Sequence, residues 1–406
     1  MRVLHVVTAF ARGDEDPITP WLGRLLIAQR TAGLDARVLA PTYRGGGARE
    51  WRGVPVTRFR YAPRLFETLT HDETVPDRLR SRPAYAALLP GYLLAGAIAA
   101  AREAARGLDV VHVHWPVPHA LFGAASRAIG GGPAVVSSYY SVEINWIERR
   151  LPALAPFLRW SIETADAVTA ISTSTAAALR RYVERDVVVI PFAAAIGDDA
   201  DAPPPRSRTG DAPFRILFVG RLVERKGVEV LIEAAAALSS SLDLRLDVIG
   251  SGPEGDRLAD AARRHGIADK VTFHGRVGEA GLLAAYRTAD VFVLPAVVDS
   301  KGDTEGLGVV LLEALREGVP VVASDAGGIT DIVQDGVTGW LVPSGDAGAL
   351  GRALVAVAAD PAEAARRVER GREQIERRFS LPGIVTALSE CYERARALRL
   401  AGPPAV

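Results

Sequence analysis

Two cations lie close together in the segment FVGRLVERKG (residues 218–227), where a short apolar run ends. Arg221 can hold two phosphate oxygens through its planar guanidinium group, and Lys226 offers a compact positive charge. A helix-forming run begins directly after them, and the first amides of a helix also attract anions. We interpret Gly220, Arg221 and Lys226 as a clamp for a pyrophosphate group. The alternative is a solvated charged loop, of which the triplet ERK is typical.

Two glutamates lie at the ends of the segment EGLGVVLLE. Glu305 stands at the entrance of a predicted helix, and Glu313 lies about two turns further along it. Between them, the amides of Gly306, Leu307 and Gly308 are placed to bind anionic oxygens. Carboxylates accept hydrogen bonds from paired hydroxyl groups, so both glutamates suit a sugar or a ribose. The alternative is that both are ordinary acids of a helix.

Three further loops follow predicted strands in the same half of the chain. Gly250 and Gly252 follow the run RLDVIG, where glycine lets a ligand approach the backbone closely. Val277 ends the run VTFHGRV, whose main chain is expected to face a base. Gly327 and Gly328 follow VPVVAS. The joint occurrence of these loops favours one ligand site over a series of unrelated turns.

The first half of the chain carries histidines and most of the tryptophans. His112, His114 and His119 cluster in and after one predicted strand, and we expect His114 and Trp115 to face a ligand. The alternative is a set of hydrogen-bonded core histidines. Aromatic rings can stack on a sugar or on the apolar part of an acceptor, although core packing is the ordinary role. The tryptophans of this half are Trp21, Trp51, Trp115, Trp146 and Trp160.

Short β-branched runs alternate with alanine-rich helical runs in both halves, which predicts an α/β protein with parallel sheets. Residues 197–213 are acidic and proline-rich without periodicity, so they read as a linker. The predicted domains are residues 1–196 and 214–380, followed by a helical segment over residues 381–406. Ligands of such sheets bind beyond the carboxyl ends of the strands.

The composition narrows the class of protein. The 406 residues have a formal net charge of zero, which argues against a nucleic-acid partner. The lone Cys391 excludes an internal disulfide framework and a cysteine-based metal site. We find no signal-peptide pattern at the N-terminus and expect a cytoplasmic protein. The stretch from Ala84 to Ala101 has no charge; we expect a buried helix there, with peripheral contact to lipid as the alternative.

These motifs, in this order, resemble the retaining nucleotide-sugar glycosyltransferases of family four. The resemblance covers nearly the whole chain and is sharpest between Arg215 and Pro343. It implies the GT-B fold, in which two Rossmann-like domains face each other across a cleft. It also implies that the tail FSLPGIVTALSECYERA is a helix crossing back to the first domain. By the same resemblance Arg221 and Lys226 bind the donor pyrophosphate, Glu305 approaches the transferred sugar, and Glu313 holds the ribose.

The chain departs from the family pattern on the acceptor side. Many members carry a histidine where this chain has Tyr140, which is followed by Glu143; we place both with His114 on the acceptor side. The loop after the first strand has only Gly13 where many members have a glycine pair. Thr330 and Asp331 stand where proline and glutamate are more usual. These departures concern the acceptor more than the donor.

The predicted function is transfer of a hexose from a nucleoside-diphosphate sugar to a glycan, a lipid-linked or a small-molecule acceptor. UDP is the default nucleotide, with GDP and ADP as alternatives. We expect no cofactor and no metal, because cations and helix amides can stabilise the leaving phosphate. The segment DSKGD (residues 299–303) is the nearest acidic cluster and reads as a solvated loop. The rival functions are a GT-B epimerase or hydrolase and a non-catalytic nucleotide-sugar-binding protein.

Overall fold

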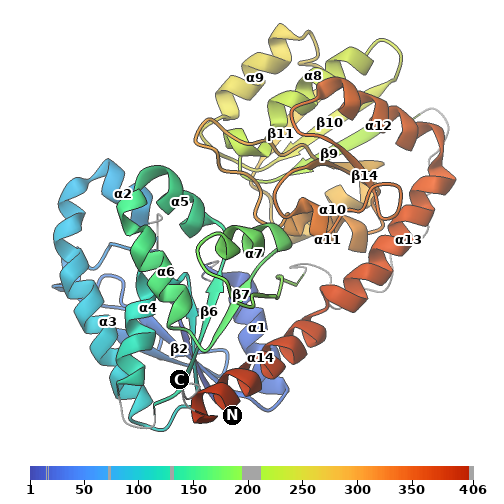
Figure 1. Ribbon diagram of the computed structural model, residues 1–406. Helices are drawn as coiled ribbons and strands as arrows, with labels where there is room; N and C mark the ends of the chain where they lie inside the picture. The colour runs from blue at the N-terminus through green and yellow to red at the C-terminus, as the bar shows by residue number, and fades with distance from the viewer. Residues whose placement is uncertain (15, 17, 72–74, 129–131, 194–211, 402–406) are drawn as a thin grey trace. The chain divides into compact units, whose positions relative to one another are not determined.

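The computed structural model describes residues 1–14, 16, 18–71, 75–128, 132–193 and 212–401 (Figure 1). Contacts divide the chain into two compact units. The first contains residues 1–171, 175–190 and 384–406, and the second contains residues 172–174 and 191–383. The predicted linker at 197–213 lies almost wholly outside the described residues. The predicted return of the C-terminal helix is confirmed, since α14 (Leu381–Ala401) belongs to the first unit from Ile384 onward.

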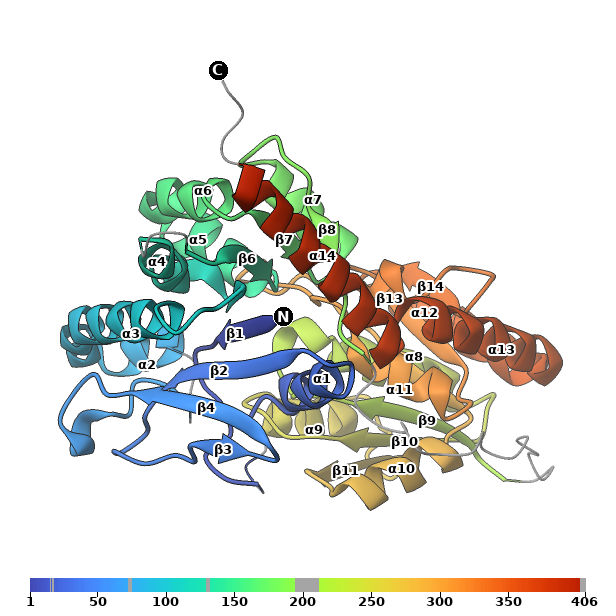
Figure 2. The ribbon, with the colours of Figure 1, turned by 90° about the horizontal axis from the view of Figure 1, so that it is seen from below.

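The first unit is built on a sheet that has eight strands in the described residues, in the order β3-β4-β2-β1-β5-β6-β7-β8. Neighbouring strands are parallel except for β3, which pairs antiparallel with β4 (Figure 2). The strands are β1 (Arg2–Val6), β2 (Asp35–Pro41), β3 (Glu50–Trp51), β4 (Val54–Phe59), β5 (Val110–His114), β6 (Ala134–Tyr139), β7 (Ala167–Ala170) and β8 (Val188–Val189).

Helices connect these strands, as right-handed parallel crossovers require. The helices are α1 (Pro20–Thr31), α2 (Val75–Ser81), α3 (Leu89–Ala104), α4 (Pro116–Arg127), α5 (Val142–Arg150), α6 (Ala155–Glu163) and α7 (Thr173–Arg180). Short 3₁₀ turns adjoin them, namely η1 (Arg64–Phe66), η2 (Pro83–Leu88) and η3 (Pro152–Leu154).

The second unit has a sheet of six described strands, all parallel, in the order β11-β10-β9-β12-β13-β14. The strands are β9 (Phe214–Val219), β10 (Leu244–Ile249), β11 (Val271–Gly275), β12 (Val291–Leu294), β13 (Val321–Asp325) and β14 (Trp340–Pro343). The connecting helices are α8 (Val228–Leu238), α9 (Gly255–Arg264), α10 (Glu279–Thr288), α11 (Val309–Arg316), α12 (Ala347–Ala359) and α13 (Pro361–Arg378), with 3₁₀ turns η4 (Glu224–Lys226) and η5 (Ile329–Asp331).

Both sheets reverse their strand order at one place. In the second unit the reversal lies between β9 and β12, which are neighbours although β10 and β11 separate them in the sequence. In the first unit it lies between β1 and β5. A crevice forms beyond the carboxyl ends of such a strand pair, and this is where open α/β sheets bind ligands. The topology therefore selects the loops after β9 and β12 and the loops after β1 and β5.

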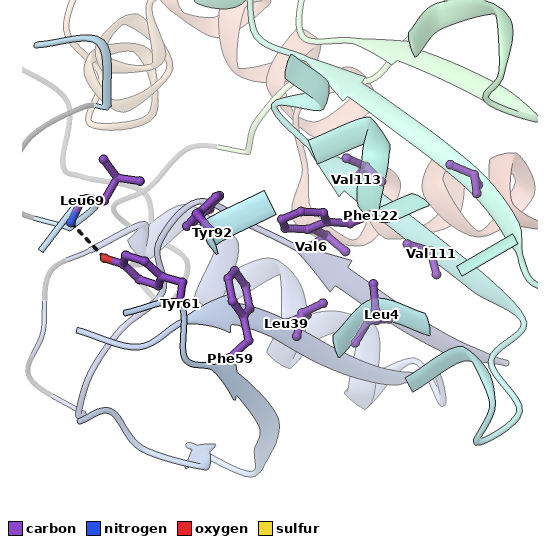
Figure 3. Packing of buried hydrophobic residues seen from close by; sticks show 12 residues of the cluster. Leu4, Val6, Leu39, Phe59, Tyr61, Leu69, Tyr92, Val111, Val113 and Phe122 are labelled. Carbon is purple, nitrogen blue, oxygen red and sulfur yellow. Dashed lines mark hydrogen bonds between the residues drawn. The ribbon is translucent and has the colours of Figure 1, made fainter. Parts of the chain in front are cut away.

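The core of the first unit lies under α3 and α4. Phe59, Tyr92 and Phe122 belong to one buried cluster (Figure 3), in which their rings pack edge to face or tilted against one another. Gly96 lets α3 approach α4 closely, because a Cβ atom there would lie 2.1 Å from the Phe122 ring. The packing of α3 thus depends on a residue without a side chain.

The expectation of a buried helix over residues 84–101 is wrong. Of the most apolar 18-residue window of Pro83–Ala104, only 17 % is buried. One side of α3 packs against α4 and the sheet, but Leu94 is 65 % exposed and Ile98 is 43 % exposed. No second layer covers this side in the described residues. Apolar composition alone cannot reveal which of two faces finds a partner.

Replacing Gly96 by alanine should lower the free energy of unfolding by about 1–3 kcal/mol, because the new methyl group meets Phe122. The matched control is Gly281→Ala, at an exposed position of α10 where the nearest neighbour is at 3.5 Å. That change should be neutral or stabilising by up to about 1 kcal/mol through helix propensity. Urea unfolding measures both. Equal effects of the two substitutions would refute the close approach of α3 to α4.

Candidate functional site

The loops after β9 and β12 meet in an ion pair between Lys226 and Glu305. The Lys226 ammonium group donates a hydrogen bond to Glu305 Oε2, across 79 residues of sequence. Only 12 % of the Lys226 side chain and 14 % of the Glu305 side chain are exposed. Lys226 ends η4, directly after β9, and Glu305 lies in the loop between β12 and α11. The pair therefore stands at the point where the strand order of the second sheet reverses.

A glycine lets the two loops come close enough for this pair. Gly227 has φ +65°, and a Cβ atom there would lie 1.8 Å from the carbonyl oxygen of Pro295, the first residue after β12. The backbone amide of Val297 donates to the carbonyl of Arg225 at 2.9 Å and joins the same two loops. Any side chain at position 227 would push the loops apart and separate the ion pair.

Lys226 keeps Glu305 ionised. Burial alone would raise the pKa of Glu305, but the charge and hydrogen bond of Lys226, the charge of Arg225 and the Gly306 amide together lower it below its usual value. Next to this carboxylate, the Thr304 hydroxyl is buried and has no hydrogen-bond partner among the described residues. A buried hydroxyl in that state is a group that a bound ligand would satisfy. Sequence reasoning missed Thr304.

The other two predicted charges stand apart from this contact. Arg221 is exposed and forms no ion pair with a described residue. Glu313 is buried on α11, and the Tyr286 hydroxyl of α10 donates to its Oε2 at 2.9 Å. Burial and the nearby Glu313 carboxylate raise the pKa of Tyr286 well above its usual value. The structure thus brings Lys226 and Glu305 together, leaves Arg221 at the surface, and gives Glu313 a protein partner.

The predicted glycines hold the loops of this edge to one another. The amide of Gly220 donates to Ile249 at 3.0 Å, and the amide of Gly250 donates to Gly275 at 2.7 Å. Cβ atoms on Gly250 and Gly252 would lie 1.9 and 2.2 Å from the carbonyl oxygens of residues 220 and 222. The absence of these side chains is therefore required by packing between the loops themselves. Whether a ligand also uses the space remains a prediction.

Gly306, Leu307 and Gly308 lead into α11. Gly308 caps the helix with φ +85°, and the Leu307 side chain is buried. Binding of anionic oxygens by the amides of this turn stays a prediction. Val277, on the loop after β11, is 38 % exposed. Asp331 is buried and accepts hydrogen bonds from the amide of Thr173 at 2.6 Å and from its hydroxyl group, so its role is structural.

The acidic loop at residues 299–303 is stabilised by hydrogen bonds from its backbone amides and from Ser300 to carboxylates. The amides of Lys301 and Asp303 donate to Asp299 Oδ1 at 2.9 and 2.8 Å. The Ser300 amide and hydroxyl donate to Glu224 of η4 at 2.8 and 2.6 Å. These contacts use the carboxylates to shape the loop beside the Lys226–Glu305 pair.

The strand reversal of the first sheet carries aromatic rings, and the loop after β1 also holds the Arg12–Asp16 ion pair. Trp21 lies in the first turn of α1, whereas Trp115 directly follows β5 and Tyr140 directly follows β6. We call these three residues the aromatic cluster. Their ring centroids lie 4.8 Å apart for Trp115–Tyr140, 5.7 Å for Trp21–Tyr140 and 6.1 Å for Trp21–Trp115. The caps of the following helices, Thr19, Trp115 and Ser141, all have positive φ. Such strained backbone concentrates at functional sites.

A chain of buried hydrogen bonds leads from Tyr140 into the sheet. His5 Nε2 lies 2.9 Å from the carbonyl oxygen of the Gln29 side chain, which only accepts, so Nε2 carries the proton of this ring. His5 Nδ1 then accepts from His114 Nε2 at 3.0 Å. His114 Nδ1 in turn accepts from the Tyr140 hydroxyl at 2.5 Å. We predicted His114 on the acceptor side. The structure buries its side chain, which contacts the Tyr140 hydroxyl through this hydrogen bond.

The same chain continues to the C-terminal helix and back. The Gln29 amide donates to the Tyr392 hydroxyl of α14 at 3.1 Å. Tyr392 then donates to His112 Nδ1 at 2.7 Å. His112 Nε2 donates to the Ser138 hydroxyl at 2.6 Å, and Ser138 lies 2.5 Å from the Thr169 hydroxyl. This chain ties α1, α14 and four strands together, and Gln29, Tyr392 and His5 in it were missed by sequence reasoning.

His5, His112 and His114 lie close enough to hold a metal ion, with ligand atoms within 4.8 Å of one another. Each of their ring nitrogens already has a hydrogen-bond partner in the chain just described. Burial lowers the pKa of His5 to about 4 and the pKa values of His112 and His114 well below their usual range. In this chain each histidine ring donates from one nitrogen and accepts at the other, which is what a neutral ring does. The geometry favours a structural network for these histidines.

Among the ionisable groups of this region, Glu143 is the best candidate for a proton donor or acceptor. It lies in the first turn of α5 and is buried, and its Oε1 accepts from the Tyr140 amide at 2.9 Å. Its Oε2 is buried without a hydrogen-bond partner among the described residues. Burial raises the pKa of Glu143 to about 7, against the lowering effect of its own amide and that of Tyr140. Such a carboxyl group can give or take a proton near neutral pH.

Two family models match the chain. One, described as "Glycosyl transferases group 1", matches residues 202–374, and the other, "Glycosyltransferase Family 4", matches residues 22–193. A curated relative from Mycolicibacterium smegmatis, the GDP-mannose-dependent alpha-(1-6)-phosphatidylinositol monomannoside mannosyltransferase, is 34 % identical over 258 residues. That alignment covers 61 % of this chain and 66 % of the relative, slightly less than two thirds of its length.

Solved structures show the same fold. Sucrose-phosphate synthase from Thermosynechococcus elongatus gives a TM-score of 0.74 at 24 % identity and covers 98 % of this chain and 99 % of its own. Anabaena HepE, in a complex with UDP and glucose, gives a TM-score of 0.68 at 19 % identity and covers 97 % of this chain and 99 % of its own. The predicted GT-B fold of two Rossmann-like domains is thereby confirmed.

Glu143→Gln should remove a pH dependence of stability from the first unit. The pKa of Glu143 is about 7 in the folded state and 4.5 for an exposed glutamate, so between these values the folded state retains a proton that the unfolded state has lost. The wild-type free energy of unfolding should therefore fall by about 2.5 kcal/mol more than that of Glu143→Gln between pH 5 and pH 8. Urea unfolding followed by tryptophan fluorescence in a Trp340→Phe background reports on the first unit.

The control for this prediction is Glu163→Gln, whose side chain is 49 % exposed beside Arg159. It should leave the pH dependence of the wild type unchanged. Parallel stability curves for wild type and Glu143→Gln would show that Glu143 is ionised at its ordinary pKa.

Proposed function

Because this chain belongs to the group 1, family 4 glycosyltransferases, we propose that it transfers a hexose from a nucleoside-diphosphate sugar to an acceptor hydroxyl group. The observation that carries the proposal is the Lys226–Glu305 ion pair at the strand reversal of the second sheet. The donor's diphosphate binds at Lys226 and at the amides that lead into α11, and its sugar lies beside Glu305.

The chemistry follows from where charge develops. The bond between the anomeric carbon and the diphosphate oxygen breaks, and negative charge builds up on the departing phosphate. Lys226 has three donors, so it can bind a phosphate oxygen while it keeps its bond to Glu305. Arg221, exposed on the same loop, adds a second cation. These groups stabilise the leaving phosphate in the way that preorganised donors do, and the proposal assigns no step to a metal.

The acceptor is a glycan, a lipid-linked or a small-molecule hydroxyl compound, and it binds at the aromatic cluster. Trp21, Trp115 and Tyr140 offer ring faces on which a sugar or an apolar group stacks. We assign retention at the anomeric carbon. The acceptor oxygen attacks the face that the phosphate leaves, and the departing phosphate oxygen takes the acceptor proton.

The names of related proteins support a nucleotide sugar and leave its base open. The mycobacterial relative is named for GDP-mannose, and HepE was solved with UDP and glucose. UDP is our first candidate, with GDP and ADP as alternatives. Thermal denaturation with UDP, GDP, ADP and TDP identifies the base, since a ligand at 100 times its dissociation constant adds about 2.7 kcal/mol of stability.

Lys226→Met should weaken binding of the stabilising nucleotide by about tenfold to a hundredfold, because it removes a charged hydrogen bond to phosphate. The matched control is Lys270→Met. Lys270 precedes β11, at the amino edge of the same sheet, and donates to the Ser239 carbonyl at 2.9 Å. It should keep wild-type affinity. Equal affinity of Lys226→Met and Lys270→Met would reject the diphosphate site.

Turnover of the matching nucleotide sugar separates transfer from the rival functions. A transferase releases nucleoside diphosphate only when an acceptor pool of lipid extract, glycans or polyols is present. Release or isomerisation without acceptor would indicate a hydrolase or an epimerase, and binding without consumption would indicate a binding protein. For a transferase, Glu305→Gln should lower turnover by about a hundredfold to a thousandfold.

A further inference from the structure

The outward side of α3 carries no charge over three turns. Pro90, Leu94 and Ile98 follow one another at intervals of four residues, which places them on one face of the helix. All three are exposed, and Arg102 continues the row. We call Pro90, Leu94 and Ile98 the outer face of α3. Figure 1 shows α3 as the outermost helix beside α4 in the first unit.

This helix is anchored in its own unit and does not fit a role as a membrane span. Its length and apolar character over Pro83–Ala104 would suffice for a span. However, Tyr92, Gly96 and Ala100 are buried on the opposite side, with Gly96 against the Phe122 ring. Spanning would expose this part of the core. The structure therefore suits a helix that lies in the plane of a membrane surface with one face buried in it.

More apolar groups lie near the beginning of α3. In η1, Leu65 is 85 % exposed and Phe66 is 60 % exposed. Thr68, two residues later, lies 3.0 Å from the Tyr85 hydroxyl in η2, and η2 leads directly into α3. The Leu65–Phe66 pair and the outer face of α3 are thus connected through η2. Together they make up the exposed apolar side chains of this part of the first unit, which we call the apolar surface.

Positive charge borders this apolar surface. The segment from residue 75 to residue 106 has five arginines against Asp77 and Glu103, in a chain with a formal net charge of zero. Glu103 is buried and pairs with Arg106. Arginines stand before η2 and at the end of α3, so both ends of the apolar face are positive. Arg78 is buried over the Tyr85 ring, so the exposed arginines of this border are Arg80, Arg82, Arg102 and Arg106.

We propose that the outer face of α3, with Leu65 and Phe66, docks the first unit on an anionic lipid bilayer. The apolar side chains enter the boundary between head groups and acyl chains, and the bordering arginines meet the lipid phosphates. A protein partner or a second copy of the chain fits less well, because nothing on the outer face offers a hydrogen bond to fix an orientation. Docking requires neither donor nor acceptor, so this inference stands independently of the proposed function.

Flotation with vesicles tests the proposal on the full chain. Wild type should bind vesicles of equimolar phosphatidylcholine and phosphatidylglycerol, and bind vesicles of phosphatidylcholine alone more weakly. Leu94→Ser/Ile98→Ser should reduce binding by about tenfold or more, since two apolar anchors are lost. Arg80→Ser and Arg82→Ser should each reduce binding to the anionic vesicles by about fivefold, an effect that salt should mask.

The matched control is Val355→Ser/Leu398→Ser, which removes two exposed apolar residues from α12 and α14. It should bind vesicles like wild type. Thermal denaturation confirms that each variant is folded, which is expected because the replaced side chains are exposed. The proposal fails if wild type does not float with anionic vesicles, or if both double variants bind equally. It also fails if light scattering shows a dimer that only Leu94→Ser/Ile98→Ser breaks.

Discussion

The ion pair between Lys226 and Glu305 constrains how the loops after β9 and β12 of the second unit are arranged. Two charges that are nearly withdrawn from water are costly unless each finds its partner, so the loops after β9 and β12 have to meet in one arrangement. That arrangement needs Gly227 against Pro295 and the amide of Val297 on Arg225. The sheet in turn has to place β9 beside β12. The pair thus links the strand order to one local charge pattern, which a diphosphate sugar can use.

The first unit repeats the strand reversal with a different set of side chains. Its strand reversal holds aromatic rings, and the polar groups behind them are neutral and hydrogen-bonded in one direction. Tyr392 brings the C-terminal helix into this network, so the last helix of the chain helps to fix Tyr140. One sheet thus has the Lys226–Glu305 ion pair at its edge, and the other has the aromatic cluster. The first suits a donor's phosphates, and the second suits an acceptor's hydroxyl group and ring faces.

The sequence was sufficient to predict which loops follow strands, because strands and loops alternate along the chain. Each ligand loop follows a strand, and the carboxyl ends of parallel strands share one edge, so the meeting of Lys226 and Glu305 was within reach. The Tyr286 contact of Glu313 was not, because it depends on how α10 packs against α11. The network of His5, Gln29 and Tyr392 joins three distant segments and has no local signal. Leu94 and Ile98 were misjudged because apolar composition does not say which helix face has a neighbour.

Hydrogen–deuterium exchange shows whether a nucleotide binds at the Lys226–Glu305 pair. Exchange of backbone amides should be compared without ligand and with saturating UDP or GDP, whichever stabilises the fold. We predict slower exchange in residues 220–228 and 304–310, on either side of the Lys226–Glu305 pair, and unchanged exchange in residues 266–271 at the opposite edge of the same sheet. Protection confined to the first unit, or spread evenly over the second, would contradict this prediction.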